Sequence, residues 1–508
     1  MQAERPGAGE RPSVLVIGTG FGGIGLAAQL LRGGYQVTLL EQSDQVGGVW
    51  RENSYPGCAC DVPSHLYSLS FAPNPNWSRR YSQQPEILAY LQEVAHRFGV
   101  LPQVRFGTRV VSADYDDSTA RWRVTSSTGE TFEADVLVPA VGQLSRPAWP
   151  DLVGLHEFRG PVMHSAQWQP EVALTGRRVA VIGTGASAIQ FVPKLVDEVA
   201  GLTVFQRSAP WVLPRLDHRY SRPGRWLTRR FPVLQRGFRR AYYALTEVFG
   251  VALTRSRPLA ALIRGVSRAQ LRWQVPDPQL RRRLVPDYQL GCKRVLFSSD
   301  WLPALARPDV VLVTDRISEV TATGVRAADG REYPADVLVL GTGFAAADLL
   351  GPIRIHGRGG LPLRQVWADG ARAYHGVTVP GFPNLFLLYG PNTNLGSGSI
   401  VVMIEAQIGY LLAALAGMRS GQSVEVRPEV AARFDAEMQH RLNRSVWAGC
   451  VSWYRTASGR ITTNWPGLPS EYQRRLAFTR TDYLVRDARD FASSGQFPGE
   501  TPGELPGN

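Results

Sequence analysis

The chain has 508 residues, and its 44% hydrophobic and 19% charged residues are typical of a globular protein with about three domains. Its four cysteines include no CxxC pair, which argues against a disulfide framework and a disulfide reductase and favours a reducing compartment. The net charge of +13 does not indicate nucleic-acid binding, because the window 219–283 alone holds sixteen arginines, no lysine and two acidic residues.

A β-α-β unit is predicted at the N-terminal end. Residues 1–13 lack the apolar stretch of a signal peptide, so they predict a disordered lead-in to a cytoplasmic protein. An apolar, β-branched run at 14–17 enters a Gly-rich turn, and a helical pattern follows as far as Leu31. A second strand at 36–40 ends in the acidic residue Glu41. This is the order of elements in a dinucleotide-binding unit.

The turn of this unit has the G-x-G-x-x-G pattern of dinucleotide-binding proteins. In such a turn Gly18 makes the tight bend, Gly20 lets the backbone approach a pyrophosphate, and Gly23 lets helix and strand pack closely. The free N–H groups and the dipole at the helix N-terminus favour phosphate. Glu41 lies eighteen residues after Gly23, where it can accept hydrogen bonds from ribose hydroxyls.

The same pattern of strand, turn, helix and strand recurs at 178–182, 183–188, 189–199 and 202–205. Its turn contains Gly183 and Gly185, with Ala188 at the third position, which is an accepted variant. Its second strand leads to Arg207 and not to an acidic residue. Because a carboxylate would repel a 2′-phosphate, whereas a guanidinium pairs with it through two hydrogen bonds, Arg207 predicts NADP. Two such units imply electron transfer from a nicotinamide to a second cofactor.

The remaining segments predict further α/β structure. Residues 108–124 and 131–141 have the pattern of β-hairpins, and 336–340 that of another strand. The Arg-rich window has helical periodicity interrupted by prolines, which predicts a helical insertion at about 215–290. The apolar run 400–418 contains an acidic and an amide side chain, so it predicts a buried helix and not a membrane span.

A family resemblance rests on the segment between the two units. Residues 158–168 resemble the F-x-G-x-x-x-H-x-x-x-W fingerprint of the class B flavoprotein monooxygenases, and the closing Trp168 resembles their Baeyer–Villiger branch. The resemblance extends from about residue 14 to about residue 466. Gly48 and Trp50, after the first unit, suit a flat ring that lies against backbone.

Shorter matches to the same family imply roles for individual residues. The sequence 291–294, Gly-Cys-Lys-Arg, is similar to the family's Lys-Arg pair, and 55–61 is similar to the loop whose Asp orients the arginine. The segment 449–454 resembles one that lies near substrate and nicotinamide. The implied FAD site comprises Gly18, Gly20, Gly23, Glu41, Gly48, Trp50 and Asp61, and the implied NADPH site comprises Gly183, Thr184, Gly185, Ser187, Gln190, Arg207 and Lys293. Arg294 is the implied active-site arginine, Asp61 orients it, Lys293 contacts the 2′-phosphate, and no metal is implied.

The implied fold is α/β, with two Rossmann-like dinucleotide-binding domains, the FAD domain being discontinuous, and a helical insertion. We expect the first part of the FAD-binding domain at 1–150, the NADPH-binding domain at 151–345, the second part of the FAD-binding domain at 346–490 and a disordered tail at 491–508. The implied reaction uses NADPH and O₂ to insert one oxygen atom next to the carbonyl of a small molecule, through a C4a-peroxyflavin. Bound cofactors carry such chemistry, and the protein orients them.

Two other functions stay open on sequence alone. The first is a flavin monooxygenase that oxidises nitrogen or sulfur in a small molecule. The second is a non-catalytic flavin-binding protein at a membrane surface, because aromatic residues lie among the arginines of 219–283. That window has no nucleic-acid recognition motif.

Overall fold

The first nucleotide-binding unit forms a parallel four-stranded sheet. The computed structural model describes residues 11–450, 454–456 and 458–487, and the tail expected at 491–508 lies outside them. The sheet has the strand order β3-β2-β1-β7 and consists of β1 (Val14–Ile17), β2 (Val37–Leu40), β3 (Val104–Arg105) and β7 (Val136–Pro139). Helix α1 (Phe21–Arg32) follows β1 and packs against α11 (Ile400–Ala416), the buried helix expected at 400–418.

The chain returns to this first sheet late in the sequence. The backbone N–H groups of Phe386 and Leu388 donate to the carbonyl oxygens of Leu137 and Pro139 in β7, at 3.0 and 3.1 Å. Residues after 380 thus extend the sheet that begins at residue 14.

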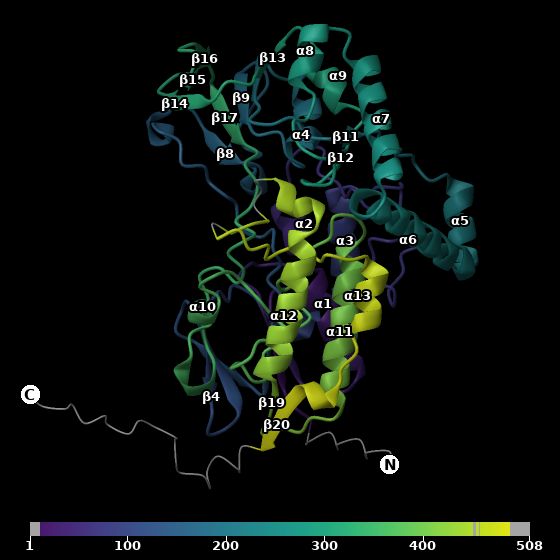
Figure 1. The fold of residues 1–508 in the computed structure, drawn as a ribbon, viewed down its shortest axis with the longest axis vertical. Helices are drawn as coiled ribbons and strands as arrows, with labels where there is room; N and C mark the ends of the chain where they lie inside the picture. Colours follow the sequence, from purple (N-terminus) through teal and green to yellow (C-terminus); the bar gives the residue numbers. More distant parts are fainter. Residues whose placement is uncertain (1–10, 451–453, 457, 488–508) are drawn as a thin grey trace, which may run out of the picture.

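The second unit forms a parallel five-stranded sheet with the order β13-β10-β9-β17-β8. Its strands are β8 (Val162–His164), β9 (Arg178–Ile182), β10 (Gly201–Phe205), β13 (Val310–Val313) and β17 (Val337–Leu340). Helix α4 (Ala188–Leu195) packs against α9 (Trp301–Leu305) beside it. Figure 1 shows this sheet in the upper half of the molecule and α1 and α11 in the lower half. The chain therefore has the two Rossmann-like units predicted from its sequence.

The predicted insertion consists of four helices. They are α5 (Arg222–Arg230), α6 (Pro232–Thr254), α7 (Arg257–Gln274) and α8 (Pro278–Arg283). Each helix has a proline at its first or second position, where the missing N–H costs no helical hydrogen bond. Figure 1 shows α5 and the adjoining end of α6 projecting from the body. None of the described helices has the length and hydropathy needed to cross a bilayer.

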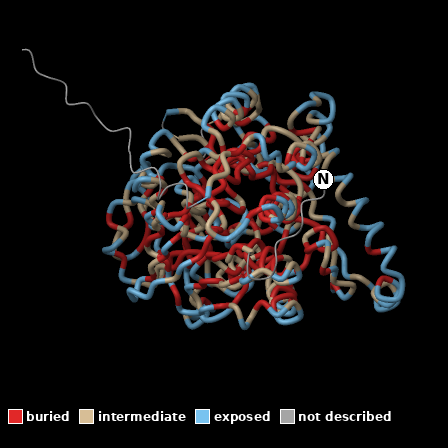
Figure 2. Tube along the Cα trace, turned by 90° about the horizontal axis from the view of Figure 1, so that it is seen from below, coloured by how far each residue is buried: buried red, intermediate tan, exposed pale blue. Residues whose placement is uncertain are grey.

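Smaller elements complete the two halves. There are three further sheets. The first consists of β4 (Val110–Asp116), β5 (Arg121–Ser126), β6 (Thr131–Ala134) and β18 (Arg354–His356). The second consists of β14 (Ile317–Thr321), β15 (Gly324–Ala327) and β16 (Glu332–Pro334), and the third of β19 (Gln422–Val426) and β20 (Tyr483–Asp487). A short pair joins β11 (Val212–Leu213) to β12 (Leu296–Phe297), and the other helices are α2 (Val49–Glu52), α3 (Gln84–Arg97), α10 (Leu363–Val366), α12 (Pro428–Asn443) and α13 (Pro469–Arg475). Figure 2 shows buried residues gathered in the interior of the body.

Candidate active site

A cavity of about 610 Å³ lies at the carboxyl end of the first sheet. The residues expected from sequence that line it are Gly18, Gly20, Glu41, Gly48, Trp50, Asp61, Ser187, Gln190 and Arg294. The structure thus brings residues of both nucleotide-binding units to one cavity. Gly23, Gly183, Thr184, Gly185, Arg207 and Lys293 are not among its lining residues.

The backbone at the first turn and at Gly48 is packed too closely to admit a side chain. Gly18 has φ +100°, and a Cβ atom there would lie 2.9 Å from the Ala140 carbonyl oxygen. Gly48 has φ +53°, and its Cβ atom would lie 2.8 Å from the Cα atom of Gly20. A Cβ atom on Gly23 would overlap the carbonyl oxygen of Gly18. Gly18, Gly20 and Gly48 therefore line the cavity with bare backbone that can approach a pyrophosphate, and Gly23 permits the close packing of α1 on β1.

The acidic residue at the end of β2 is held in place by hydrogen bonds. The buried Glu41 carboxylate accepts from the backbone N–H and the hydroxyl of Thr19, at 2.9 and 2.6 Å, and from the backbone N–H of Ser43 at 3.0 Å. Trp50 and Tyr67 line the same cavity, and the Trp50 indole N–H donates to the Tyr67 hydroxyl at 3.1 Å. The pyrophosphate cradle, the acid for a ribose and an aromatic wall thus belong to one cavity, which fits FAD.

A cationic cluster lies beside the second turn. The Thr184 hydroxyl donates to the carbonyl oxygen of Ser208 at 3.2 Å, and Lys293 Nζ donates to the Ser208 hydroxyl at 3.1 Å. Partial burial lowers the pKa of Lys293, and the charge of Arg207 lowers it further. Two cations and a hydroxyl near a Gly-rich turn fit a 2′-phosphate. Ser208 was not singled out from sequence, although it directly follows Arg207.

Gln190 joins the two nucleotide-binding units. Its side-chain oxygen accepts from the Tyr55 hydroxyl at 3.0 Å and from the Ala59 backbone N–H at 3.2 Å, and its side-chain N–H donates to the Ala59 carbonyl at 3.0 Å. These bonds fix helix α4 to the loop that carries Asp61. Ser187 lines the same part of the cavity.

An arginine and a carboxylate face each other in the cavity. Arg294 donates to Asp61 through Nε at 3.0 Å and through Nη2 at 2.8 and 2.6 Å. The Asp61 carboxylate raises the pKa of Arg294 above its already high ordinary value. Although the pair lies deep in the protein, the Arg294 side chain is 44% accessible, because it faces the cavity. The geometry holds a permanent positive charge toward the cavity at a fixed angle.

Two tyrosines complete the surroundings of Arg294. Burial raises the pKa of Tyr454, and the positive charge of the neighbouring Arg294 opposes that rise. The Tyr389 hydroxyl donates to the side-chain oxygen of Asn394 at 2.9 Å, and both residues line the cavity. Tyr454 belongs to the segment 449–454, which the sequence places near the site without a role for this residue. Tyr389 follows an apolar run without any motif that would have marked it.

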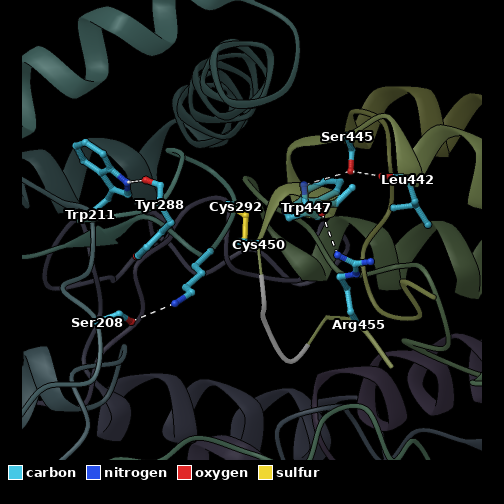
Figure 3. Close-up of a disulfide and its surroundings, with 11 residues drawn as sticks. Ser208, Trp211, Tyr288, Cys292, Leu442, Ser445, Trp447, Cys450 and Arg455 are labelled. Carbon is cyan, nitrogen blue, oxygen red and sulfur yellow. Dashed lines mark hydrogen bonds between the residues drawn. A yellow bond between two sulfur atoms is a disulfide. The ribbon is translucent and has the colours of Figure 1, made fainter. Parts of the chain in front are cut away.

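A disulfide bond between Cys292 and Cys450 corrects the expectation drawn from the cysteines. Their Cα atoms lie 6.2 Å apart across 158 sequence positions. Figure 3 shows the bond joining the side that carries Ser208 and Tyr288 to the side that carries Trp447. The absence of a CxxC pair could not reveal this link, because the two segments meet only in the folded protein. Cys58 and Cys60 are buried free thiols, and burial raises the pKa of Cys58 to about 11.

The fingerprint segment links the two halves. His164 ends β8, and its Nδ1 atom accepts from the backbone N–H of Ala166 at 3.1 Å. Burial lowers the pKa of His164, so its ring is neutral near pH 7. Trp168 packs on Phe191 of α4, with ring centroids 5.7 Å apart. His164 and Trp168 thus fix the entry of the chain into the second unit and do not line the cavity.

Comparison with known proteins identifies the family. The flavin-binding monooxygenase-like family matches residues 11–241. A Baeyer–Villiger monooxygenase of Streptomyces coelicolor is 44% identical over 93% of this chain and 92% of its own length. The solved structures of an oxidised steroid monooxygenase bound to NADP and of OTEMO in complex with FAD and NADP are 31% and 27% identical, and both have a TM-score of 0.83. Each of these two comparisons covers 94% of this chain and 99% of the solved chain.

This chain is an FAD-dependent monooxygenase that uses NADPH. Within that class it belongs to the Baeyer–Villiger monooxygenases. The predicted family, fold class and cofactors are confirmed. Neither the oxidation of nitrogen or sulfur nor a non-catalytic role is favoured by these relatives.

Proposed function

We propose that the enzyme converts a small-molecule ketone into an ester or lactone. The balanced reaction consumes the ketone, O₂, NADPH and a proton, and it yields the ester, NADP⁺ and water. The observation that carries this proposal is the Arg294–Asp61 pair, which directs a fixed cation into the cavity. Relatives named Baeyer–Villiger and steroid monooxygenases support a carbonyl compound as the substrate.

Residues of this chain would hold the cofactors, which supply hydride transfer and oxygen activation when bound. Gly18, Gly20 and Gly48 would accept the FAD pyrophosphate against backbone, with Glu41 toward the ribose. Beside the second turn, Arg207 and Lys293 would pair with the 2′-phosphate of NADPH, and the Gly183–Gly185 backbone would face its pyrophosphate.

Arg294 would stabilise the negative charge that develops on the carbonyl oxygen of the substrate. A preorganised cation next to a developing oxyanion typically lowers the barrier by about 3–4 kcal/mol. Asp61 acts as a positioning residue, because its two carboxylate oxygens fix the plane of the guanidinium.

The domain boundaries follow from the same proposal. We assign residues 1–150 and 346–490 to a discontinuous FAD-binding domain and residues 151–345 to the NADPH-binding domain. The return of Phe386 and Leu388 to β7 supports this division. We also propose a location in the cytoplasm, where NADPH is available.

The experiment that tests the function measures NADPH consumption by the purified enzyme across a panel of ketones. A matched panel of thioethers and amines serves as the comparison. Mass spectrometry of the products should show the gain of one oxygen atom in ketones, as an ester or lactone. Oxygenation confined to the thioethers or amines would contradict the proposal.

A further inference from the structure

Exposed large hydrophobic side chains gather on the helical insertion. Of nineteen such side chains among the described residues, twelve lie between Trp226 and Trp273, on or between α5, α6 and α7. Trp273 is 82% exposed, Leu262 64% and Trp226 61%. Apolar patches of this kind on a protein surface mark interaction sites.

The exposed side chains form a stripe along α6. Phe231, Leu234, Phe238, Leu245 and Val248 are all exposed, and with Ala241 they follow one another at alternating steps of three and four. Such spacing places side chains on one face of a helix. This stripe therefore runs along most of α6.

Helix α7 carries a second stripe of the same kind. Leu259, Leu262, Val266 and Trp273 are exposed, and Ala269 completes the alternating steps of three and four. Each helix thus presents one apolar face to solvent in addition to its packed face.

Another face of α6 holds the helix against the body. The Gln235 side chain donates to the Asn74 carbonyl at 2.6 Å, and Arg239 forms an ion pair with Glu405 at 2.8 Å. The exposed stripe lies to one side of these contacts. The projecting arm formed by α5 and α6 is mostly exposed in Figure 2, where it lies on the right. Phe238 of the stripe also stacks on the His65 ring, with centroids 5.6 Å apart. Packing on the body therefore accounts for only part of the stripe, and Leu245 and Val248 remain more than half exposed.

The same helices carry a strong positive charge. Residues 219–276 contain thirteen arginines, no lysine and a single acidic residue, Glu247. Within the described part of the chain, only Arg239 and Arg255 of these arginines form ion pairs. Glu247 accepts from the backbone N–H and the hydroxyl of Ser470, at 3.0 and 2.7 Å. The helices therefore combine apolar stripes with a net positive charge, which favours an anionic partner.

We propose that α5, α6 and α7 bind the surface of an anionic lipid bilayer. In this arrangement the apolar stripes enter the headgroup region, and the arginines at the edges of the stripes, such as Arg240 and Arg272, contact lipid phosphates. A second copy of the chain seated face to face would oppose arginines with arginines, since a two-fold interface repeats one surface. Nucleic acid would satisfy the charge but not the stripes. The enzyme is thus a peripheral membrane protein, which goes beyond its oxygenase function.

The test is flotation of the FAD-loaded enzyme with vesicles, a measurement that does not depend on oxygenation. Vesicles of phosphatidylglycerol and phosphatidylcholine should bind the enzyme, and vesicles of phosphatidylcholine alone should bind it at least about tenfold more weakly. Each replacement in the series Arg230→Gln, Arg240→Gln and Arg272→Gln should lower the partition coefficient by about fivefold. Half-molar salt should lower binding further.

Variants that replace apolar side chains test whether binding requires the stripes in addition to the positive charge. The pair Leu245→Ser and Val248→Ser, two stripe residues that are 53% and 56% exposed, should lose binding with unchanged oxygenase activity in solution, which shows that the protein is folded. The matched control is Val153→Ser with Val311→Ser, two exposed residues elsewhere on the surface that should leave binding intact. Equal binding to neutral and anionic vesicles, or no binding to either, would overturn the proposal. So would a dimer that the two stripe substitutions dissolve, or DNA binding that they leave unchanged.

Discussion

Arg294 has a charge that does not depend on pH and an orientation set by a single partner. Its contacts with Asp61 involve two donor nitrogens and both carboxylate oxygens. The effect of such a pair depends on the orientation of the guanidinium as well as on its charge, because a bidentate contact fixes the plane of the guanidinium. Mutations of Arg294 and Asp61 can therefore separate the effect of the charge from the effect of the orientation.

Replacement of Arg294 by alanine should leave FAD binding and flavin reduction by NADPH intact and lower ester formation by about 10²–10³-fold. The physical reason is the loss of the cation beside the developing oxyanion. Stopped-flow absorbance would follow flavin reduction, and product analysis would follow oxygenation. Asp61→Asn retains the arginine but loses the carboxylate charge, so it should fall between Arg294→Ala and the unaltered enzyme. Ester yield unchanged in Arg294→Ala would refute the assigned role.

Lys293 should make NADPH binding sensitive to alkaline pH. Its protonated amine would pair with the 2′-phosphate, and burial beside Arg207 lowers its pKa. The charge is complete below the lowered pKa and is lost as pH rises through it, so the KM for NADPH should rise at a lower pH than an ordinary lysine would produce. Lys293→Arg should remove this rise, because arginine stays charged. Steady-state kinetics from pH 7 to about pH 10 would measure it.

Preference for NADPH over NADH should depend on the same two cations. Arg207→Ala and Lys293→Ala should each raise the KM for NADPH by about tenfold and leave that for NADH nearly unchanged. NADH serves as the internal control, since it lacks the 2′-phosphate. Equal increases for both coenzymes would show that these residues support the fold and not the phosphate.

At the scale of elements, local patterns predicted most of the fold. The strand at 178–182 was predicted with its observed bounds, because a short apolar run before a Gly-rich turn has few alternatives. The predicted helix 189–199 ends earlier in the structure, at Leu195, because the chain turns toward β10. Prolines marked the starts of α5 to α8.

Contacts between distant segments could not be read from local patterns. Gln190 resembled a nucleotide-binding residue, but its partners Tyr55 and Ala59 lie more than 130 positions away. Tyr389 reaches the cavity through the return of the chain to the first sheet. The disulfide depends on the same kind of encounter. Motifs identify groups that bind a known ligand, whereas these contacts depend on topology.

The Cys292–Cys450 disulfide should stabilise the contact between the segment that precedes β12 and the segment that follows α12. Its reduction with dithiothreitol should cost about 2–4 kcal/mol and lower the urea midpoint of unfolding, because the link restricts the unfolded chain. The KM for NADPH should also rise, since Lys293 follows Cys292 directly. The double variant Cys292→Ala, Cys450→Ala should resemble the reduced enzyme and should not respond to dithiothreitol. A response of the double variant would implicate Cys58 or Cys60 instead.

At the scale of the whole molecule, two nucleotide-binding units must cooperate across one cavity. The second unit contributes Ser187, Gln190 and Arg294 to a cavity whose other walls come mainly from the first. Electron transfer and oxygenation therefore require that the two units hold a common geometry. Gln190 makes direct polar contacts across this boundary, through its bonds to Tyr55 and Ala59, beside the Arg294–Asp61 pair.

Replacement of Gln190 by alanine should uncouple NADPH oxidation from oxygenation. It leaves the backbone N–H and carbonyl of Ala59 without their partner, at a cost of about 1–3 kcal/mol, so the loop with Asp61 and the second unit lose their fixed relation. FAD content should stay near normal, while hydrogen peroxide replaces part of the ester, as measured by peroxide assay against NADPH consumed. Gln439→Ala is the matched control, because Gln439 makes the same kind of amide contacts with Ile461 within one half of the molecule. If both variants uncouple the enzyme equally, the effect arises from general loss of stability and not from the boundary between the units.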